Sequence, residues 1–279
     1  MSFKIVVDSC GELTPEMKND PRIVSAPLTL EVGGETFIDD ETFQQKVFLE
    51  KVAASPECPK SSCPSPKVYF DYFSTEEDHH YAVTLSSELS GSYNSAMLGR
   101  SMAIEDDSEK KIYVFNSRSA SIGQTLITKK IMECEEAGME FEKIVEAVEA
   151  YISSQNTYFV LENLETLRKN GRLSNFKAFF ASALKIKPIC GATPEGQIYQ
   201  LDQARGINKA LVKMVDYIVA KAVDSERRTL AITHCNCPER AQMVLEAIKD
   251  RIKVKDSFVL DTAGVSTMYA SDGGIIVVL

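Results

Sequence analysis

Residues 81–96 read YAVTLSSELSGSYNSA, and this stretch decides the predicted fold. Its first five residues form a short apolar run typical of a buried strand, and a helix is expected to begin near Gly91. The turn between them carries four serines, Ser86, Ser87, Ser90 and Ser92. A helix N-terminus offers free backbone N–H groups and the positive end of its dipole, so this turn predicts a cradle for a small anion. A simple N-cap role for Ser90 or its neighbour is the alternative.

Strand-like and helical segments alternate on both sides of this turn. The apolar runs FKIVVD, IVSAPLTLEV and KIYVFN alternate with helical periods at about 42–54, 122–137 and 141–154. Such alternation is typical of a parallel sheet covered by helices, whose strand-end loops meet at one edge where ligands usually bind. Residues 1–152 are therefore expected to form an N-terminal α/β domain with hydroxyl-rich ligand loops.

The second half has a different pattern. Its apolar runs are TYFVL, IKPICGA, QIYQLDQA, TLAITH, SFVLD and GGIIVVL, and residues 194–196 predict a hairpin turn between the second and the third. Helices are expected up to Asn170-Gly171 and over Phe176–Leu184, Asn208–Val223 and Glu239–Arg251. This order predicts a mixed, largely antiparallel α+β domain over residues 153–279. The fold class is therefore α/β with two domains, and a chain of 279 residues is long enough for a buried ligand site between them.

The composition is that of an ordinary globular protein, with 44% hydrophobic and 25% charged residues. The net charge of −9 argues against nucleic acid, because binding a phosphate backbone requires a basic surface. Residues 1–150 hold 14 Lys and Arg against 27 Asp and Glu, whereas residues 151–279 hold 17 against 13. The first residues do not resemble an export signal, and no apolar run approaches the roughly 18 residues of a membrane span, so a cytoplasmic location is expected. Seven cysteines, spread from Cys10 to Cys237, fit reduced thiols better than a disulfide framework.

Two further hydroxyl-rich loops accompany the first. The segment KSSCPSP at residues 60–66 presents Ser61 and Ser62 on a loop stiffened by prolines, and NSRSASIGQ at residues 116–124 again follows a strand and precedes a helix. The sequence contains no recognised nucleophile elbow, dinucleotide fingerprint or phosphate loop. Because a serine without a base is only a hydrogen-bonding group, these loops favour binding over catalysis.

Few side chains offer a general base or a metal ligand. His79 and His80 lie in an acidic stretch that is expected to be exposed. His234 ends a predicted strand and is followed by Cys235 and Cys237, but no second cysteine pair has the spacing of a zinc site. Packing at the strand end is therefore favoured over a metal site.

Two groups of charged residues could have a function: Asp8, and the basic residues around the helix predicted at residues 176–184. Asp8 ends the first strand, where it is expected to anchor a loop by accepting backbone N–H bonds. Basic residues also bracket the predicted helix that contains three phenylalanines: Arg168, Lys169, Arg172, Lys177, Lys185 and Lys187. A solvated face is the simpler interpretation of this group, and a docking patch beside an apolar wall is the alternative.

Taken in order, these segments resemble the DegV family of bacterial fatty-acid-binding proteins. The similar segments are VVDSCGEL, KSSCPSP, LSSELSGSYNSA, NSRSASIGQ, LRKNGRLS with KIKPI, QARGINKAL and ITHCN. They run along nearly the whole chain, and the ordered set is far more specific than any one of them.

The resemblance implies two α/β domains with a long-chain fatty acid in a buried tunnel between them. It also implies that the chain is a carrier rather than an enzyme, with the fatty acid as its bound ligand and no cofactor, and that a partner fatty-acid kinase phosphorylates the carboxylate presented to it. Carried over by position, the residues expected to hold that carboxylate are Ser61, Ser62, Ser90, Ser92, Thr267 and Arg205.

One segment departs from the family pattern. The family has a C-terminal run of the form G-T-H-x-G-P-G, whereas residues 266–274 read STMYASDGG, so Met268 stands where a histidine is expected. Two other functions stay open at this point. One is an enzyme that uses a serine outside the recognised motifs, and the other is a binding module for another small anionic ligand.

Overall fold

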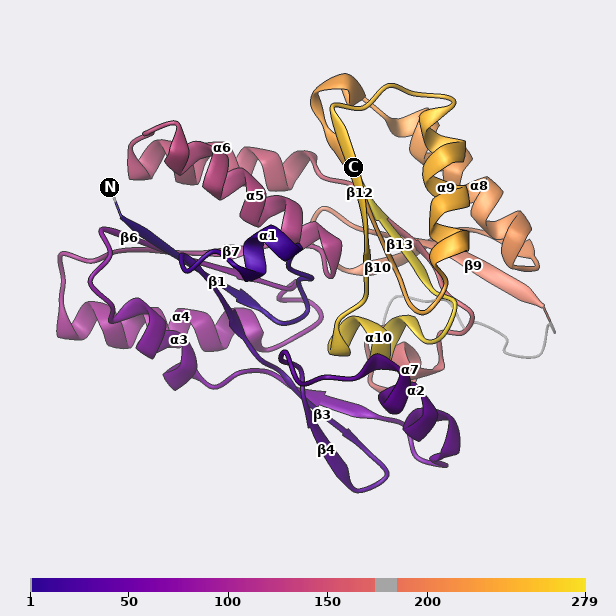
Figure 1. Cartoon of the computed structure of the whole chain (residues 1–279), viewed down its shortest axis with the longest axis horizontal. Helices are drawn as coiled ribbons and strands as arrows, with labels where there is room; N and C mark the ends of the chain where they lie inside the picture. Colours follow the sequence, from indigo (N-terminus) through magenta and orange to yellow (C-terminus); the bar gives the residue numbers. More distant parts are fainter. Residues whose placement is uncertain (1, 174–184) are drawn as a thin grey trace.

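A four-stranded parallel sheet forms the core of the first half, as seen in the computed structural model, which describes residues 2–173 and 185–279 (Figure 1). In spatial order its strands are β2 (Ile23–Ala26), β1 (Phe3–Asp8), β6 (His79–Thr84) and β7 (Lys111–Asn116). All neighbouring strands run parallel, which confirms the sheet predicted from the alternation of strands and helices. The C-terminal ends of β1, β6 and β7 point toward the second half of the chain (Figure 1).

Helices cover both faces of this sheet. They are α5 (Ile122–Glu136) and α6 (Phe141–Ser154) on one face, and α3 (Pro66–Phe73) and α4 (Ser92–Asp106) on the other, with the short α1 (Pro15–Lys18) following β1. Side chains on β1 alternate between these layers: Ile5 and Val7 pack under α5 and α6, while Val6 packs against α3 and α4. A strand buried on both faces needs apolar residues at every position, which explains the continuous run IVV.

A six-stranded mixed sheet organises the second half. Its strands, in spatial order, are β10 (Ile198–Arg205), β9 (Ile186–Ala192), β8 (Thr157–Val160), β13 (Ile275–Val278), β11 (Thr229–His234) and β12 (Asp256–Asp261). Every pair except β11 with β12 is antiparallel, so the predicted mixed, largely antiparallel sheet is confirmed. Helices α8 (Ile207–Lys221) and α9 (Pro238–Lys249) cover one face, and a 3₁₀ turn, η1 (Ser225–Arg227), precedes β11.

A small third sheet was not expected from the sequence. It consists of β4 (Glu35–Ile38), β3 (Thr29–Val32) and β5 (Lys60–Ser62), and packs with α2 (Gln45–Ala54) against α10 (Gly264–Ala270). The run IVSAPLTLEV is split at Pro27 between two sheets, because proline has no N–H to continue a ladder. Helix α3 begins at Pro66 directly after its N-cap Ser65, because proline is tolerated at the first helical position.

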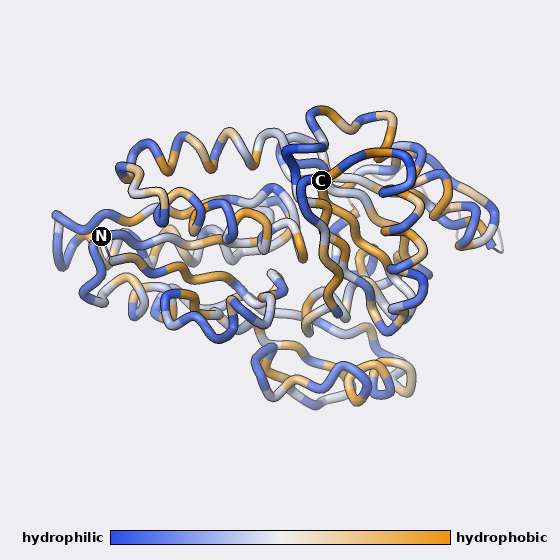
Figure 2. The backbone as a smooth tube through the Cα atoms, turned by 45° about the horizontal axis from the view of Figure 1, so that its top comes forward, coloured by the Kyte–Doolittle hydropathy of each residue, from blue (hydrophilic) through white to orange (hydrophobic). Residues whose placement is uncertain are grey.

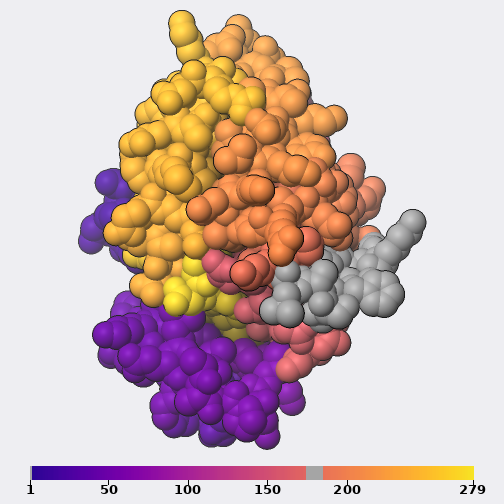
Figure 3. Space-filling view, turned by 90° about the vertical axis from the view of Figure 1, so that its right-hand side faces the viewer, coloured from indigo at the N-terminus to yellow at the C-terminus, as the bar shows by residue number. Residues whose placement is uncertain are grey.

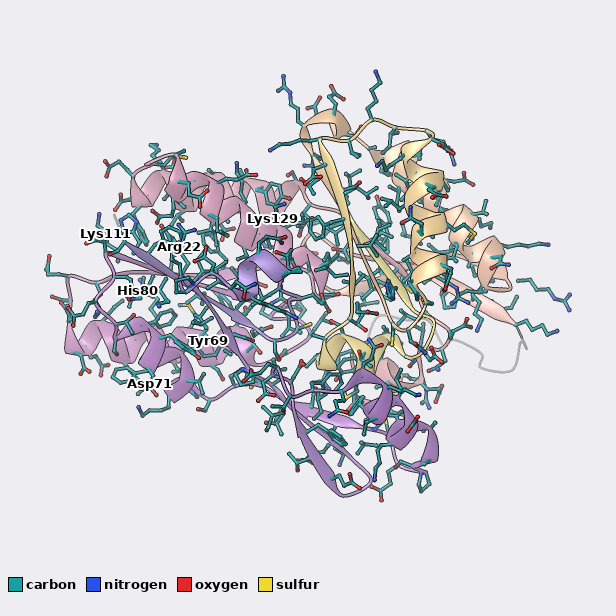
Figure 4. The ribbon with its side chains drawn as sticks, viewed as in Figure 1. Arg22, Tyr69, Asp71, His80, Lys111 and Lys129 are labelled. Carbon is teal, nitrogen blue, oxygen red and sulfur yellow. The ribbon has the colours of Figure 1, made fainter. Side chains whose placement is uncertain are left out.

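The expectation that His79 and His80 are exposed is wrong. Both side chains are about 1% exposed, because they begin β6 instead of ending the acidic loop before it. His79 Nδ1 lies 2.7 Å from Glu135 Oε1 on α5, and His80 Nε2 lies 3.1 Å from the Thr75 hydroxyl. Figure 4 shows His80 at the end of the sheet farther from α10.

Hydrophobic residues are concentrated in the strands of the two larger sheets, while the connecting loops are mostly hydrophilic (Figure 2). No helix among residues 2–173 and 185–279 is long and apolar enough to cross a membrane. The division after residue 152 falls in the last turn of α6 and stays a prediction. The helix expected over Phe176–Leu184 lies outside the described residues.

Candidate ligand-binding site

A cavity lies where the ends of the parallel strands meet the second sheet. The space between its walls measures about 740 Å³, which includes a part open to solvent. Most of its wall is apolar, and its aliphatic and aromatic residues include Leu89, Phe159, Leu161, Leu167, Ile198 and Ile276. A wall of this composition suits an alkyl chain.

Loops that follow three parallel strands line one side of this cavity. Cys10 follows β1, Leu85 and Leu89 follow β6, and residues 119–121 follow β7. The structure thus confirms that these loops converge at the C-terminal edge of the sheet.

Asp8 fixes two of these loops. Its carboxylate accepts backbone N–H bonds from Cys10 at 3.2 Å and from Leu85 at 2.8 Å, and a side-chain bond from Gln124 at 2.9 Å. This confirms the loop-anchoring role expected for Asp8, and it positions the cavity wall rather than any reacting group.

Helix α10 supplies the opposite wall, and a buried carboxylate holds its first turn. Asp39, next to β4, accepts bonds from the backbone N–H groups of Gly264 at 2.6 Å and Val265 at 2.9 Å, and from the Ser9 hydroxyl at 2.9 Å. A Cβ atom on residue 264 would lie 2.5 Å from Asp39 Oδ1, so this approach requires glycine. Figure 3 shows residues of the C-terminal end, in yellow, between the violet small-sheet region and the orange second half.

A third buried carboxylate, Glu12, links four segments around the cavity. It accepts bonds from the Ser121 hydroxyl at 2.8 Å and from the Ala263 backbone N–H at 3.2 Å. The Ser121 hydroxyl lies 2.8 Å from that of Thr233 on β11. Glu12 therefore joins the loops after β1 and β7 to the second sheet and to the start of α10.

Burial changes the acidity of these carboxyl groups. It raises the pKa of Asp8 and that of Asp39 to about 6, and the pKa of Glu12 to about 7, since desolvation of the charge outweighs the hydrogen bonds that each group accepts. Three groups that hold the cavity walls together therefore change protonation near neutral pH.

Besides the hydroxyl side chains of Ser119, Ser121, Thr157 and Ser266, the cavity wall has a polar stretch that contains a phenol and a cation. Tyr269 on α10 lines the cavity, and its hydroxyl lies 3.3 Å from that of Ser61 on β5. Arg172, which follows α7 (Glu165–Lys169), also lines the cavity, and its Nε donates to the Leu89 carbonyl at 3.1 Å. The Tyr269 phenol and the Arg172 side chain thus both border the apolar space, and Ser61 contacts the phenol.

The residues expected to hold a carboxylate lie at different distances from this polar stretch. Ser61 meets it through Tyr269, and Ser62 is the next residue on β5, with an exposed side chain. The hydroxyls of Ser90 and Ser92 lie 3.2 Å apart at the start of α4, whose N-cap is Gly91. Their role as ligand residues stays a prediction.

The other two residues expected to hold the carboxylate, Thr267 and Arg205, do not line the cavity. The Thr267 hydroxyl is fully buried, and it lies 2.8 Å from the Thr262 hydroxyl and accepts a bond from Gln45 Nε2 at 3.3 Å. Arg205 is exposed at the end of β10 and borders a separate hollow with Asn208 on α8, not the cavity described above.

Met268 does not take the place of a histidine in the cavity wall. Its side chain is 2% exposed and packs in the apolar cluster that contains Leu28, Leu30 and Phe48. The next residue, Tyr269, is the one that reaches the cavity. The sequence could have signalled this, because Tyr269 is the polar aromatic residue in the departing segment.

His234 and its neighbouring cysteines pack at the strand end. His234 Nδ1 accepts the backbone N–H of Cys237 at 3.3 Å and lies 3.1 Å from Asp261 Oδ1. In the part of the chain that the structure describes, no group of three His, Cys, Asp or Glu side chains has the arrangement of a metal site.

The basic residues near α7 do not form one uniform patch. Arg168 pairs with Glu165 at 2.8 Å and Lys187 with Glu162 at 2.6 Å, while Arg172 borders the cavity. Lys177 lies outside the described residues. The Arg168 pair is exposed and such pairs contribute little, so a solvated face accounts for Arg168, whereas Lys187 is half-buried.

Comparison with known proteins places this geometry in a family. A family model described as "Uncharacterised protein, DegV family" matches residues 2–279. The chain belongs to the DegV family. A DegV domain-containing protein of Streptococcus pneumoniae is 32% identical over 99% of this chain and 98% of its own length. The whole-chain match confirms the resemblance seen in the sequence.

Solved DegV structures share the complete fold. A DegV family protein from Ruminococcus gnavus, refined with vaccenic acid, is 54% identical and superimposes with a TM-score of 0.97 over 100% of both chains. The Streptococcus pneumoniae Fatty Acid Kinase (Fak) B3 protein, loaded with linoleic acid, is 31% identical, with a TM-score of 0.91 over 100% of this chain and 99% of its own. These DegV neighbours carry bound fatty acids.

Proposed function

We propose that this DegV chain binds a long-chain fatty acid in the cavity and presents its carboxylate to a partner fatty-acid kinase, without catalysing the transfer itself. The observation that carries the proposal is an apolar cavity with one polar stretch, in a fold whose 54% identical neighbour was refined with vaccenic acid. Burying about 14 methylenes at about 0.8 kcal/mol each gives roughly 11 kcal/mol before association costs. The alkyl tail therefore dominates retention.

The direct test is to extract the purified protein with organic solvent and to identify the lipid by mass spectrometry. The expected result is one long-chain fatty acid per chain, and delipidated protein that takes up added oleate or palmitate. Protein that is repeatedly lipid-free and binds neither acid would refute the carrier function. Another bound anion would support the binding module instead.

The kinase partnership needs its own test, with a fatty-acid kinase of the type that uses the Fak B3 protein. Phosphorylation of the bound acid is expected with wild-type protein. Replacing Ser62 and Ser90 together by alanine is expected to leave the lipid bound but poorly phosphorylated, because each bond to a carboxylate is worth only about 1.5–3 kcal/mol. Loss of all lipid in the double variant would show instead that the head group controls retention.

One observation favours a second candidate function, a serine-dependent enzyme. Ser121 lines the cavity with φ of 58° and ψ of −133°, a conformation that non-glycine residues rarely adopt, between β7 and α5. Its hydroxyl bonds to Glu12, whose pKa burial raises to about 7, a value suited to a general base. The hydroxyl oxygen would attack an acyl carbonyl while its proton passes to Glu12, which returns it to the leaving group; water then releases the acid.

Turnover of aryl esters of fatty acids distinguishes the two functions. The carrier function predicts no turnover above that of a Ser121→Ala variant. Turnover that disappears in Ser121→Ala, but persists in a Ser87→Ala control, would establish the enzyme.

A further inference from the structure

We propose that a basic hollow between the two halves of the chain binds a small anion with two or more linked phosphate groups, such as pyrophosphate or the phosphates of a nucleotide. The hollow shares no lining residue with the cavity described above. Its wall contains five cationic side chains: Lys129, Lys130, Arg227, Arg228 and Lys255. Because it concerns a different site, this inference is independent of the carrier function.

Segments that are distant in the sequence bring these cations together. Lys129 and Lys130 lie on α5 in the first half, and Lys129 is at the border of the two halves (Figure 4). Arg227 ends η1 in the second half, and Arg228 follows it. The backbone N–H of Lys255, just before β12, donates to the Arg228 carbonyl at 2.8 Å, which fixes these two residues side by side. An anion in the hollow would therefore contact both halves.

The lysines of the hollow are only loosely paired within the protein. Lys130 Nζ lies 3.6 Å from the Glu133 carboxylate, and Lys255 Nζ lies 3.5 Å from it. Lys129 Nζ lies 3.7 Å from Asp256 Oδ2. These distances exceed the roughly 2.7–2.9 Å of a direct bond between an ammonium group and a carboxylate. The N–H donors of these lysines can therefore turn toward a ligand.

The two arginines differ in what they already bind. Arg228 Nη1 donates to the Ser154 carbonyl at 2.7 Å, which holds its guanidinium near the end of α6. Within residues 2–173 and 185–279, the Arg227 side chain has no hydrogen bond or ion pair. A guanidinium binds two phosphate oxygens at once through its planar set of donors. Arg227 therefore offers that complete set to a ligand.

The balance of charge indicates the class of ligand. Glu133 and Asp224 are the carboxylates among the described lining residues, so five cations against two anions leave an excess of three positive charges. This excess stands on a chain whose net charge is −9, and a hollow of one sign concentrates its field on a ligand with several negative charges. The hollow measures about 760 Å³, which includes a part open to solvent. A lipid surface is a poorer fit, because it requires exposed apolar side chains and the aliphatic residue of this wall, Leu126, is buried.

The test measures pyrophosphate binding by isothermal titration calorimetry at constant ionic strength. Wild-type protein is expected to bind one pyrophosphate per chain, about tenfold or more tightly than sulfate. Lys129→Gln combined with Arg227→Gln removes one cation from each half and is expected to weaken pyrophosphate binding about tenfold or more. The matched control combines Lys143→Gln with Arg251→Gln, which removes the same two kinds of charge from exposed pairs outside the hollow. Its affinity should stay within about threefold of the wild type.

A second variant should gain affinity. Glu133→Gln removes the carboxylate that competes for Lys130 and Lys255, so pyrophosphate should bind about threefold or more tightly. The matched control is Glu146→Gln, which removes an exposed carboxylate from α6 and should change the affinity by less than about twofold. Equal changes in both variants would reveal a general charge effect and would overturn the site.

Titration with ATP identifies the source of the phosphates. An affinity above that of pyrophosphate assigns a nucleotide, and an affinity no higher assigns the phosphates alone. No saturable heat with either anion, equal affinity for sulfate, or an equal loss in the matched double control would overturn the inference. Vesicles of phosphatidylglycerol that bind the wild type but not the Lys129 and Arg227 variant, without any binding of pyrophosphate, would replace it with a lipid surface. Bound fatty acid, measured by mass spectrometry, should be the same in all variants and tests the carrier function separately.

Discussion

Replacing Asp39 by alanine should loosen the wall of the cavity. Asp39 accepts two backbone N–H bonds from the first turn of α10 and one bond from Ser9, and it is 3% exposed. Alanine leaves the buried N–H groups of Gly264 and Val265 without this acceptor, at about 1–3 kcal/mol each. The variant no longer buries a charge, which offsets part of this cost. We therefore expect its free energy of unfolding to fall by about 2–3 kcal/mol at pH 7.5.

The stability difference between the wild type and the Asp39→Ala variant should also depend on pH. Because the folded pKa of Asp39, about 6, is above its value of 3.8 in a model peptide, the stability that the wild type draws from this group is full below pH 3.8 and is lost as pH rises through 6. The alanine variant has no such loss. The difference between the two proteins should therefore be about 1–2 kcal/mol larger at pH 5 than at pH 7.5.

Urea unfolding followed by far-ultraviolet circular dichroism measures both quantities, provided that the m-values agree. Asp39→Asn retains one acceptor oxygen without the charge and should cost less than Asp39→Ala. The control is Asp40→Asn, where the exposed carboxylate bonds only locally to Thr42 and the change should stay below about 1 kcal/mol. An Asp39→Ala protein as stable as this control at both pH values would refute the holding role of Asp39.

Three further predictions concern other buried residues. The folded pKa of Glu12 is about 7, so the wild type should lose stability as the pH rises from 4.5 through 7. In Glu12→Gln the urea midpoint of unfolding should vary less with pH across that range. Burial lowers the pKa of His80 to about 4, so the wild type should lose about 3 kcal/mol as pH falls from 6.5 through 4, and His80→Phe should remove that slope. Met268→His should destabilise the fold by about 2 kcal/mol, because it buries an imidazole beside Leu28 and Phe48. Calorimetry should show no gain in palmitate affinity for that variant below pH 6.5; a gain would mean that residue 268 reaches the ligand after all.

The sequence by itself determined the elements and the family. The alternation of apolar runs with helical periods predicted the parallel strands β1, β6 and β7, and the turn at residues 194–196 predicted the β9–β10 hairpin. Both patterns are local, since side-chain periodicity and turn chemistry depend on residues close in the chain. The hydroxyl-rich segments at residues 86–92 and 116–124 were likewise placed correctly at strand ends, whereas Ser61 and Ser62, expected on a loop, lie on strand β5 because this segment pairs with β3.

Only the tertiary structure decided which of these side chains meet. Asp39 and Gly264 are 225 residues apart, and Ser61 and Tyr269 are 208 apart, so no local pattern could reveal either contact. The same limit explains the error over His79 and His80, whose acidic neighbours predicted exposure while the sheet buries them. Burial, and the pKa changes that follow from it, arise when distant segments pack together and exclude water. The cavity wall, the buried carboxylates and the position of Tyr269 beside the cavity therefore became visible only in the folded chain.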